Sequence, residues 1–337
     1  NIIYKIELFI LFNYIIMIAF KFSDNVTQNN NSFGEIIKLD NYNDIIYINC
    51  TGNNLYKSFS LPELPNSLIE LNCSNNSLSS LPKLPNSLQI LWCGFNRLSC
   101  LPELPNSLIK LICSKNNLSS LPKLPNSLQI LLCGFNNLSS LPELPDSLIE
   151  LSCFSNSLSS LPELPNSLRE LCCNNNNLSN LPELPNSLTE INCSHNNIYK
   201  LPKLPDLLDM LQCYNNKISS LPELPNLLTY FWCDNNNLSS LPELSNSFKY
   251  LSCYNNKISS LPTLPNSTVD INYFSNPIYT HILTYFDGEI IKYDEYKIKI
   301  KRIFVNKIEN WFLECKYNPK YSYCRKRLMK EYEELYG

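Results

Sequence analysis

The sequence predicts an α/β-class repeat solenoid, in which stacked coils of the chain build a parallel sheet along one side. Three observations lead to this class. The sequence repeats itself every 20 residues from Leu61 to Leu261. Each repeat contains a short stretch in which alternate residues are apolar, as a half-buried strand requires. Every repeat except the one with Leu241–Ser245 also carries two prolines three residues apart, and these exclude a helix on the return path. A period of this length indicates stacked units rather than two ordinary domains.

The repeat unit has the pattern L-x-x-L-x-C-x-x-N-x-L-x-x-L-P-x-L-P, as in Leu68–Pro85. We call each unit a coil and expect about twelve of them. The alternation around Leu71 and Cys73 predicts a short strand with both side chains pointing inward. The Asn ladder is the set of recurring asparagines: Asn53, Asn76, Asn96, Asn116, Asn136, Asn156, Asn176, Asn196, Asn216, Asn236, Asn256 and Asn276. The Cys ladder is the corresponding set of cysteines: Cys50, Cys73, Cys93, Cys113, Cys133, Cys153, Cys173, Cys193, Cys213, Cys233 and Cys253, followed by Tyr273 in the last coil.

Each ladder Asn is predicted to turn the chain after its strand, because its amide can satisfy backbone groups that the turn would leave unpaired. The Leu-Pro-x-Leu-Pro segment lacks two backbone donors and pushes each preceding Leu into an extended conformation. The convex side is therefore expected to be extended or polyproline-II-like. The strands are expected to stack into a parallel sheet on the concave side.

These motifs resemble the short LPX-type leucine-rich repeats of bacterial effectors of the YopM and IpaH kind, over roughly residues 45–278. The Cys ladder and the Asn-, Ile-, Tyr- and Lys-rich composition look more like leucine-rich-repeat proteins of giant DNA viruses of the mimivirus type. The ending Asn310–Cys315, Asn318-Pro319 and Cys324-Arg325 also resembles the tail of such viral proteins. The resemblance implies protein binding. Proteins of the IpaH kind add a C-terminal ubiquitin-ligase domain with a catalytic Cys, whose motif this sequence does not show.

The chain is expected to have three parts. For residues 1–44, three alternatives stay open: upstream read-through with Met17 as the true start, a hydrophobic end cap, or a targeting segment. Residues 45–278 form the solenoid. Residues 279–337 are expected to form a basic cap of two helices, 300–315 and 324–335, folded over the last coil, because a solenoid end cannot bury its own open face.

Composition and spacing argue against an enzyme, a metal site or a cofactor. The 15 Cys follow the repeat and include no C-x-x-C pair, which favours buried free thiols and a reducing compartment. His195 and His281 are far apart in the chain, with no nucleophile spaced to suit either. Cys172 occupies an outward strand position, but no neighbouring cation is present to lower its pKa.

The outward strand positions carry the functional signal, since a solvated sheet face should be polar. The candidate binding residues fall into an apolar zone and an aromatic zone, separated by an acidic zone of three glutamates. The apolar zone comprises Ile90, Trp92, Ile112, Ile130 and Leu132. The acidic zone comprises Glu150, Glu170 and Glu190. The aromatic zone comprises Tyr214, Tyr230, Trp232, Tyr250 and Tyr254. The alternative interpretation is repeat duplication followed by drift, because scattered apolar surface residues are normal.

We therefore expect a non-enzymatic, monomeric interaction scaffold, a viral protein of the host cytoplasm that binds a host or viral protein through the concave face. No membrane span is expected. Two alternatives remain. The basic cap has eleven Lys and Arg between Lys297 and Lys330 and could bind nucleic acid or an anionic membrane. The chain could also be an adaptor that recruits host machinery, such as a ubiquitin ligase.

Overall fold

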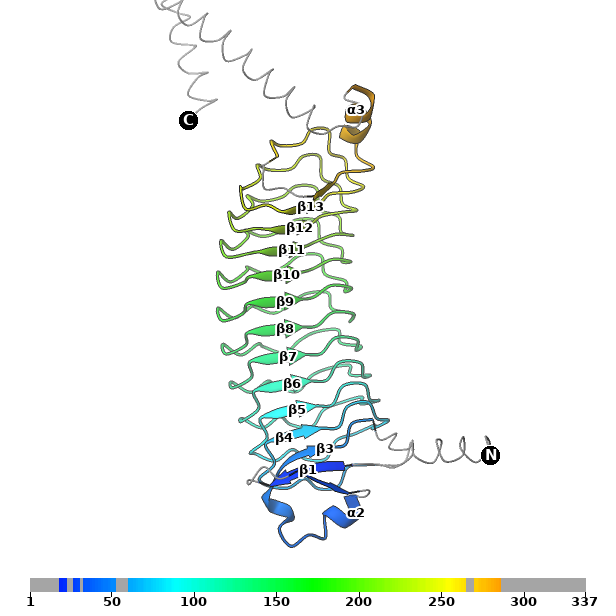
Figure 1. Ribbon diagram of the computed structural model, residues 1–337, viewed down its shortest axis with the longest axis vertical. Coiled ribbons are helices and arrows are strands. Elements are labelled where there is room, and N and C mark those ends of the chain that lie inside the picture. The colour runs from blue at the N-terminus through cyan, green and yellow to red at the C-terminus, as the bar shows by residue number, and fades with distance from the viewer. Residues whose placement is uncertain (1–17, 23–26, 31–32, 53–59, 265–269, 286–337) are drawn as a thin grey trace, which may run out of the picture. The chain divides into compact units, whose positions relative to one another are not determined.

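The computed structural model describes residues 18–22, 27–30, 33–52, 60–264 and 270–285 (Figure 1). The chain divides into two compact units, Asn1–Asn276 and Pro277–Gly337. The predicted helices 300–315 and 324–335, and the basic residues of the predicted cap, lie outside the described residues.

The first unit is a solenoid built on one 14-stranded sheet. Strands β3 to β14 follow one another in chain order, and each pairs with the next in parallel and in register (Figure 1). The sheet strands are β1 (Ile18–Phe22), β2 (Thr27–Asn30), β3 (Ile45–Asn49), β4 (Glu70–Asn72), β5 (Ile90–Trp92), β6 (Lys110–Ile112), β7 (Ile130–Leu132), β8 (Glu150–Ser152), β9 (Glu170–Cys172), β10 (Glu190–Asn192), β11 (Met210–Gln212), β12 (Tyr230–Trp232), β13 (Tyr250–Ser252) and β14 (Asp270–Asn272). The predicted parallel-sheet solenoid is confirmed.

Before the first coil, the chain adds two antiparallel strands to the sheet. β1 pairs with β3 on one side and with β2 on the other. Its alternate residues Ile18, Phe20 and Phe22 are buried. The connection from β2 to β3 contains helix α2 (Phe33–Ile36) and a 3-10 turn (Tyr42–Asp44). Residues 1–17, on which the read-through and targeting alternatives depend, lie outside the described residues.

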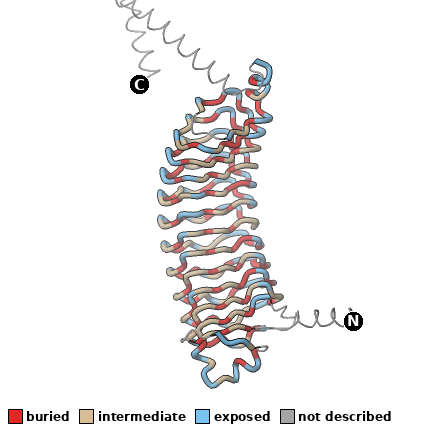
Figure 2. The backbone as a smooth tube through the Cα atoms, viewed as in Figure 1, coloured by how far each residue is buried: buried red, intermediate tan, exposed pale blue. Residues whose placement is uncertain are grey.

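Buried residues recur in coil after coil along the solenoid (Figure 2). All eleven cysteines of the Cys ladder have no solvent exposure, and the central residue of each three-residue strand from β4 to β13 is also buried. The prediction that the Cys ladder packs as small apolar side chains is confirmed. The described Leu-Pro-x-Leu-Pro segments contain neither helix nor strand, as their prolines require.

The Asn ladder joins each coil to the one before it. Asn96 Nδ2 donates to the Cys93 carbonyl of its own coil at 3.1 Å and to the Cys73 carbonyl of the preceding coil at 3.0 Å. Its Oδ1 accepts a hydrogen bond from the Leu78 amide at 3.0 Å. The same set recurs down to Asn276. The predicted role of the Asn ladder is confirmed for its described members. Asn53 lies outside the described residues.

Two further periodic features were not predicted. The residue before each ladder Asn from Asn75 to Ser275 has a positive φ of 51 to 56°. This left-handed conformation costs most L-residues free energy. A second ladder is formed by the Ser that precedes the strand: Ser87 Oγ, for example, donates to the Leu68 carbonyl of the preceding coil at 2.7 Å.

The second unit contributes one described helix, α3 (Pro277–Tyr285). It begins at a proline, which is well suited to the first turn of a helix. None of the described helices has the length and apolar character of a membrane span.

Candidate functional site

The candidate site is the outward side of the sheet, which we call the open face. It is formed by the first and third residues of the three-residue strands β4 to β14, while the second residue points into the core. Most of these strands show a buried central residue between two half-buried ones. This follows from the pleat of a strand, which sends successive side chains to opposite sides. The parity predicted for the candidate residues on the strands is therefore correct. Tyr214 and Tyr254 lie outside the strands, and Tyr254 is exposed.

The apolar zone spans three adjacent strands. Register places Trp92 next to Ile112, and Ile112 next to Leu132. Lys110 interrupts the zone between Ile90 and Ile130. The Lys110 Nζ lies 5.0 Å from the centre of the Trp92 ring, within cation–π range.

The Trp92 side chain has an unpaired donor. Its Nε1 is buried and has no hydrogen-bond acceptor in the described structure. A buried N–H without a partner costs about 1–3 kcal/mol.

An apolar edge in the turns after β5 to β8 adjoins this zone and was not predicted from the sequence. Lys115 Nζ lies 4.5 Å from the Phe95 ring centre and 5.0 Å from that of Phe135, in the coils on either side. Phe135 in turn makes an edge-to-face contact with Phe154 at 4.8 Å. Phe95 and Phe135 are about half exposed, at 49% and 46%. The repeated Gly-Phe dipeptide at 94–95 and 134–135 was the available signal.

The acidic zone lies in the middle of the open face. Glu150, Glu170 and Glu190 are register partners on β8, β9 and β10. Burial raises the pKa of the Glu150 carboxyl, the charge of Glu170 raises it further, and Lys110 partly offsets both. Burial also raises the pKa of Glu190, followed by the charges of Glu170 and Asp209. Like charges in register repel one another.

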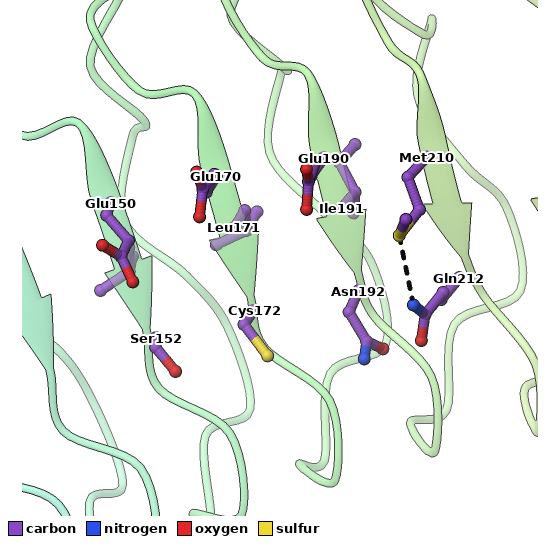
Figure 3. A pocket seen from close by; sticks show the side chains of 11 residues that line it. Glu150, Ser152, Glu170, Leu171, Cys172, Glu190, Ile191, Asn192, Met210 and Gln212 are labelled. Atoms are coloured by element: carbon purple, nitrogen blue, oxygen red, sulfur yellow. Dashed lines mark hydrogen bonds between the residues drawn. The ribbon is translucent and has the colours of Figure 1, made fainter. Parts of the chain in front are cut away.

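These three carboxylates line a cavity of about 240 Å³ together with Cys172, Met210 and Gln212, among others (Figure 3). The Gln212 amide lies 3.5 Å from the Met210 sulfur. Cys172 Sγ donates to Asn174 Oδ1 at 3.0 Å, and burial raises the pKa of its thiol. Cys172 therefore has little thiolate character at neutral pH.

The aromatic zone contains one compact cluster. The rings of Tyr230 and Trp232 are nearly parallel, with centres 6.0 Å apart, and Tyr250 lies 5.1 Å from Trp232. Tyr214 shares a cavity of about 290 Å³ with Trp232, Gln212 and Asp234. Tyr254 lies in the turn after β13 and is 39% exposed.

Asp234, which the sequence analysis did not single out, sits beside this cluster. Its Oδ1 accepts hydrogen bonds from the Ser252 hydroxyl and from the Tyr254 amide, the latter at 2.9 Å. Burial raises the pKa of its carboxyl, and these hydrogen bonds partly offset the effect.

The described residues show no arrangement that would bind a metal, in that no three His, Cys, Asp or Glu side chains come together suitably. His195 lies in the turn after β10, where its Nε2 is 3.1 Å from Asn215 Nδ2 and its ring contacts Tyr214. The open face thus offers apolar, aromatic and carboxylate groups for contact with a partner.

No protein-family model and no curated protein sequence matches the chain. Among solved structures, the fold is similar to YopM from Yersinia enterocolitica, with 39% identity and a TM-score of 0.64, over 65% of this chain and 49% of that one. It is also similar to YopM, a leucine-rich effector protein from Yersinia pestis, with 34% identity and a TM-score of 0.54, over 68% of this chain and 77% of that one. The chain belongs to the leucine-rich-repeat proteins.

A third leucine-rich-repeat structure shares the fold at lower identity. The functional domain of InlJ from Listeria monocytogenes, which includes a cysteine ladder, is 23% identical with a TM-score of 0.57, over 68% of this chain and 53% of that one. The chain thus spans about half the length of the InlJ structure and of the first YopM structure.

Proposed function

We propose that this leucine-rich-repeat chain is a non-enzymatic scaffold that binds a protein partner through the open face. The observation that carries the proposal is the register of Trp92, Ile112 and Leu132, three large apolar side chains on adjacent strands of a solvated sheet face. Contiguous apolar surface of this kind is typical of an interaction site. Trp and Tyr are also the commonest anchors of protein interfaces.

The proposal includes a setting for this binding. The similarity to a leucine-rich effector protein supports action on proteins of a host cell. Eleven buried free thiols suit a reducing compartment such as the host cytoplasm. A viral origin rests on the sequence resemblance to giant-virus proteins. We further propose that the chain acts as a monomer.

Site-specific cross-linking tests the binding face. A photoreactive amino acid at Ile112 would lie on the open face, whereas the same group at exposed Lys123 would lie in a Leu-Pro-x-Leu-Pro segment on the opposite side. We expect a discrete protein adduct from position 112 in host-cell extract and none from position 123. Adducts from position 123 alone would place the partner on the convex side and contradict the proposal. Adducts that require Arg325, Lys326 and Arg327 would favour the basic cap instead.

A further inference from the structure

The aromatic cluster on β12 and β13 has an open side. Tyr250 covers Trp232 from the neighbouring strand β13. On the other side, toward β11, Trp232 faces the cavity of about 290 Å³ that it shares with Gln212, Tyr214 and Asp234. The cavity therefore combines aromatic rings with a carboxylate. A planar guanidinium suits such a cavity, because it stacks on an indole and pairs with a carboxylate at the same time.

The charged residues within the strands around this cavity have one sign. Between β8 and β13 the strands carry Glu150, Glu170 and Glu190 and no Lys or Arg. The one cation within strands β4 to β14 is Lys110 on β6, which lies over Trp92. Arg169 and Lys249 are exposed positions that precede β9 and β13. A partner that docks on this half of the open face would meet acidic and aromatic groups.

The acidic zone and the aromatic cavity are neighbours along the stack. Glu190 is on β10 and Trp232 on β12, with Met210 and Gln212 of β11 between them. At about 4.8 Å per strand, the step from the carboxylates to the indole is roughly 10–14 Å. An extended peptide advances about 3.3 Å per residue, so three or four residues cover this distance.

We propose that this half of the open face binds an extended segment of the protein partner that carries two arginines four residues apart, because residues four apart in an extended chain point to the same side. One guanidinium pairs with Glu170 and Glu190, where it relieves the repulsion between two carboxylates in register. The other enters the cavity between Trp232 and Asp234. The inference rests on the proposed protein-binding function and names the chemistry of the partner.

Peptide binding to the full chain tests this inference. The probes are fluorescent eight-residue peptides of Gly, Ser and two arginines, blocked at both ends, with no, three or six residues between the arginines. Anisotropy at low ionic strength measures their affinity. We expect the peptide with three intervening residues to bind most tightly, because both of its arginines point to the same side, and we expect binding to weaken as salt screens the charges. The same peptide with citrulline in place of both arginines should lose at least about tenfold in affinity, because it keeps the shape and loses the charge.

Matched variants locate the binding. Glu190→Gln and Trp232→Ser should each weaken binding of the two-arginine peptide by about fivefold or more. Glu183→Gln removes one charge from an exposed position in a Leu-Pro-x-Leu-Pro segment and should leave binding unchanged. Equal binding of the citrulline peptide, equal effects of Glu183→Gln and Glu190→Gln, or no binding at all would overturn the inference. Cross-linking from Ile112 would persist in that case. The cross-linking experiment therefore tests the proposed protein-binding function, and the peptide experiment tests only this inference.

Discussion

Asn96 Nδ2 donates to the carbonyl oxygen of Cys73 in the preceding coil at 3.0 Å. This bond links the two ladders across a coil boundary, and it recurs with a separation of 23 residues down to Asn276 and Cys253. A buried amide that serves two coils is hard to replace, because its removal leaves backbone groups on both sides without a partner.

The first prediction concerns this ladder. Asn176→Ala removes the donor to the Cys153 and Cys173 carbonyls and the acceptor for the Leu158 amide. We expect the free energy of unfolding to fall by about 1–3 kcal/mol. Chemical denaturation followed by circular dichroism measures the change. The matched control is Asn177→Ala at the exposed neighbouring position. If the two variants had the same free energy of unfolding, the ladder would not stabilise the coils as described.

Asn175 is not a neutral control, because its φ of 54° lies in the left-handed region. Alanine there would cost about 1–2 kcal/mol for reasons unrelated to the ladder. Glycine, which adopts this conformation readily, would separate the two effects.

The fold could be predicted almost fully from the sequence because each coil repeats the same physical constraints. Period-two alternation determines that the side chains of Trp92 and Ile112 both point outward. The two prolines of each Leu-Pro-x-Leu-Pro segment exclude a helix there. The contacts within the open face could not be predicted. Lys110 lies over Trp92, and Lys115 lies between Phe95 and Phe135. These contacts depend on side-chain rotamers and on which variable residues the register places side by side in neighbouring coils. The left-handed conformation of the residue before each ladder Asn could not be predicted from the sequence, because Asn, Phe, Lys, Ser and His all occur at this position.

The second prediction concerns thiol reactivity. Cys100 is exposed in a Leu-Pro-x-Leu-Pro connection, whereas Cys172 is half-buried, donates a hydrogen bond to Asn174 and has a raised pKa. Among the described cysteines, we expect Cys100 to react first with iodoacetamide, Cys172 more slowly, and the Cys ladder only after denaturant is added. Peptide mapping by mass spectrometry resolves each site. Fast labelling of Cys113 in the native protein would contradict the buried ladder.

The third prediction is a loss of stability at alkaline pH. Burial raises the pKa of Cys113 and of Cys193 from 9.0 to about 12. Above pH 9.0 the unfolded chain loses these protons while the folded chain keeps them, so the free energy of unfolding falls as pH rises. The decline continues up to about pH 12, at about 1.4 kcal/mol per pH unit for each such thiol.

Melting temperatures at pH 8, 9 and 10 measure this decline. Cys113→Val should melt with a shallower dependence on pH, because one buried thiol no longer titrates. An identical pH dependence of the variant and the wild type would show that ladder thiols are not responsible.

The fourth prediction compares the effects of alanine substitution at Gly94 and Gly134, the two glycines that follow β5 and β7. A Cβ on Gly134 would lie 2.5 Å from the Phe154 ring, whereas a Cβ on Gly94 would lie 3.0 Å from the Ser114 carbonyl oxygen. We expect Gly134→Ala to destabilise the solenoid by about 1–3 kcal/mol and Phe154→Ser to rescue it, because the obstacle is a side chain. A double-mutant cycle measures the coupling. Phe154→Ser should not rescue Gly94→Ala, and rescue of both would argue against the contact described.

The last prediction tests the open face with its two tryptophans. Trp92→Ser and Trp232→Ser remove half-buried side chains, so each should cost the fold only about 1 kcal/mol. Trp92→Phe should cost less or stabilise the fold, because it also removes the unpaired Nε1 donor. Binding of the protein cross-linked from Ile112 should weaken by about 2 kcal/mol or more for whichever Trp is an anchor.

The two tryptophans lie seven coils apart, roughly 34 Å along the stack at 4.8 Å per step. One small partner need not contact both, so the single variants can differ, and circular dichroism establishes first that each is folded. If the basic cap were the binding site, both Trp variants would bind normally, and charge reversal at Arg325, Lys326 and Arg327 would abolish binding in a salt-dependent way. If both Trp variants fold and retain full affinity, the proposal that the partner binds the open face through a Trp anchor is wrong.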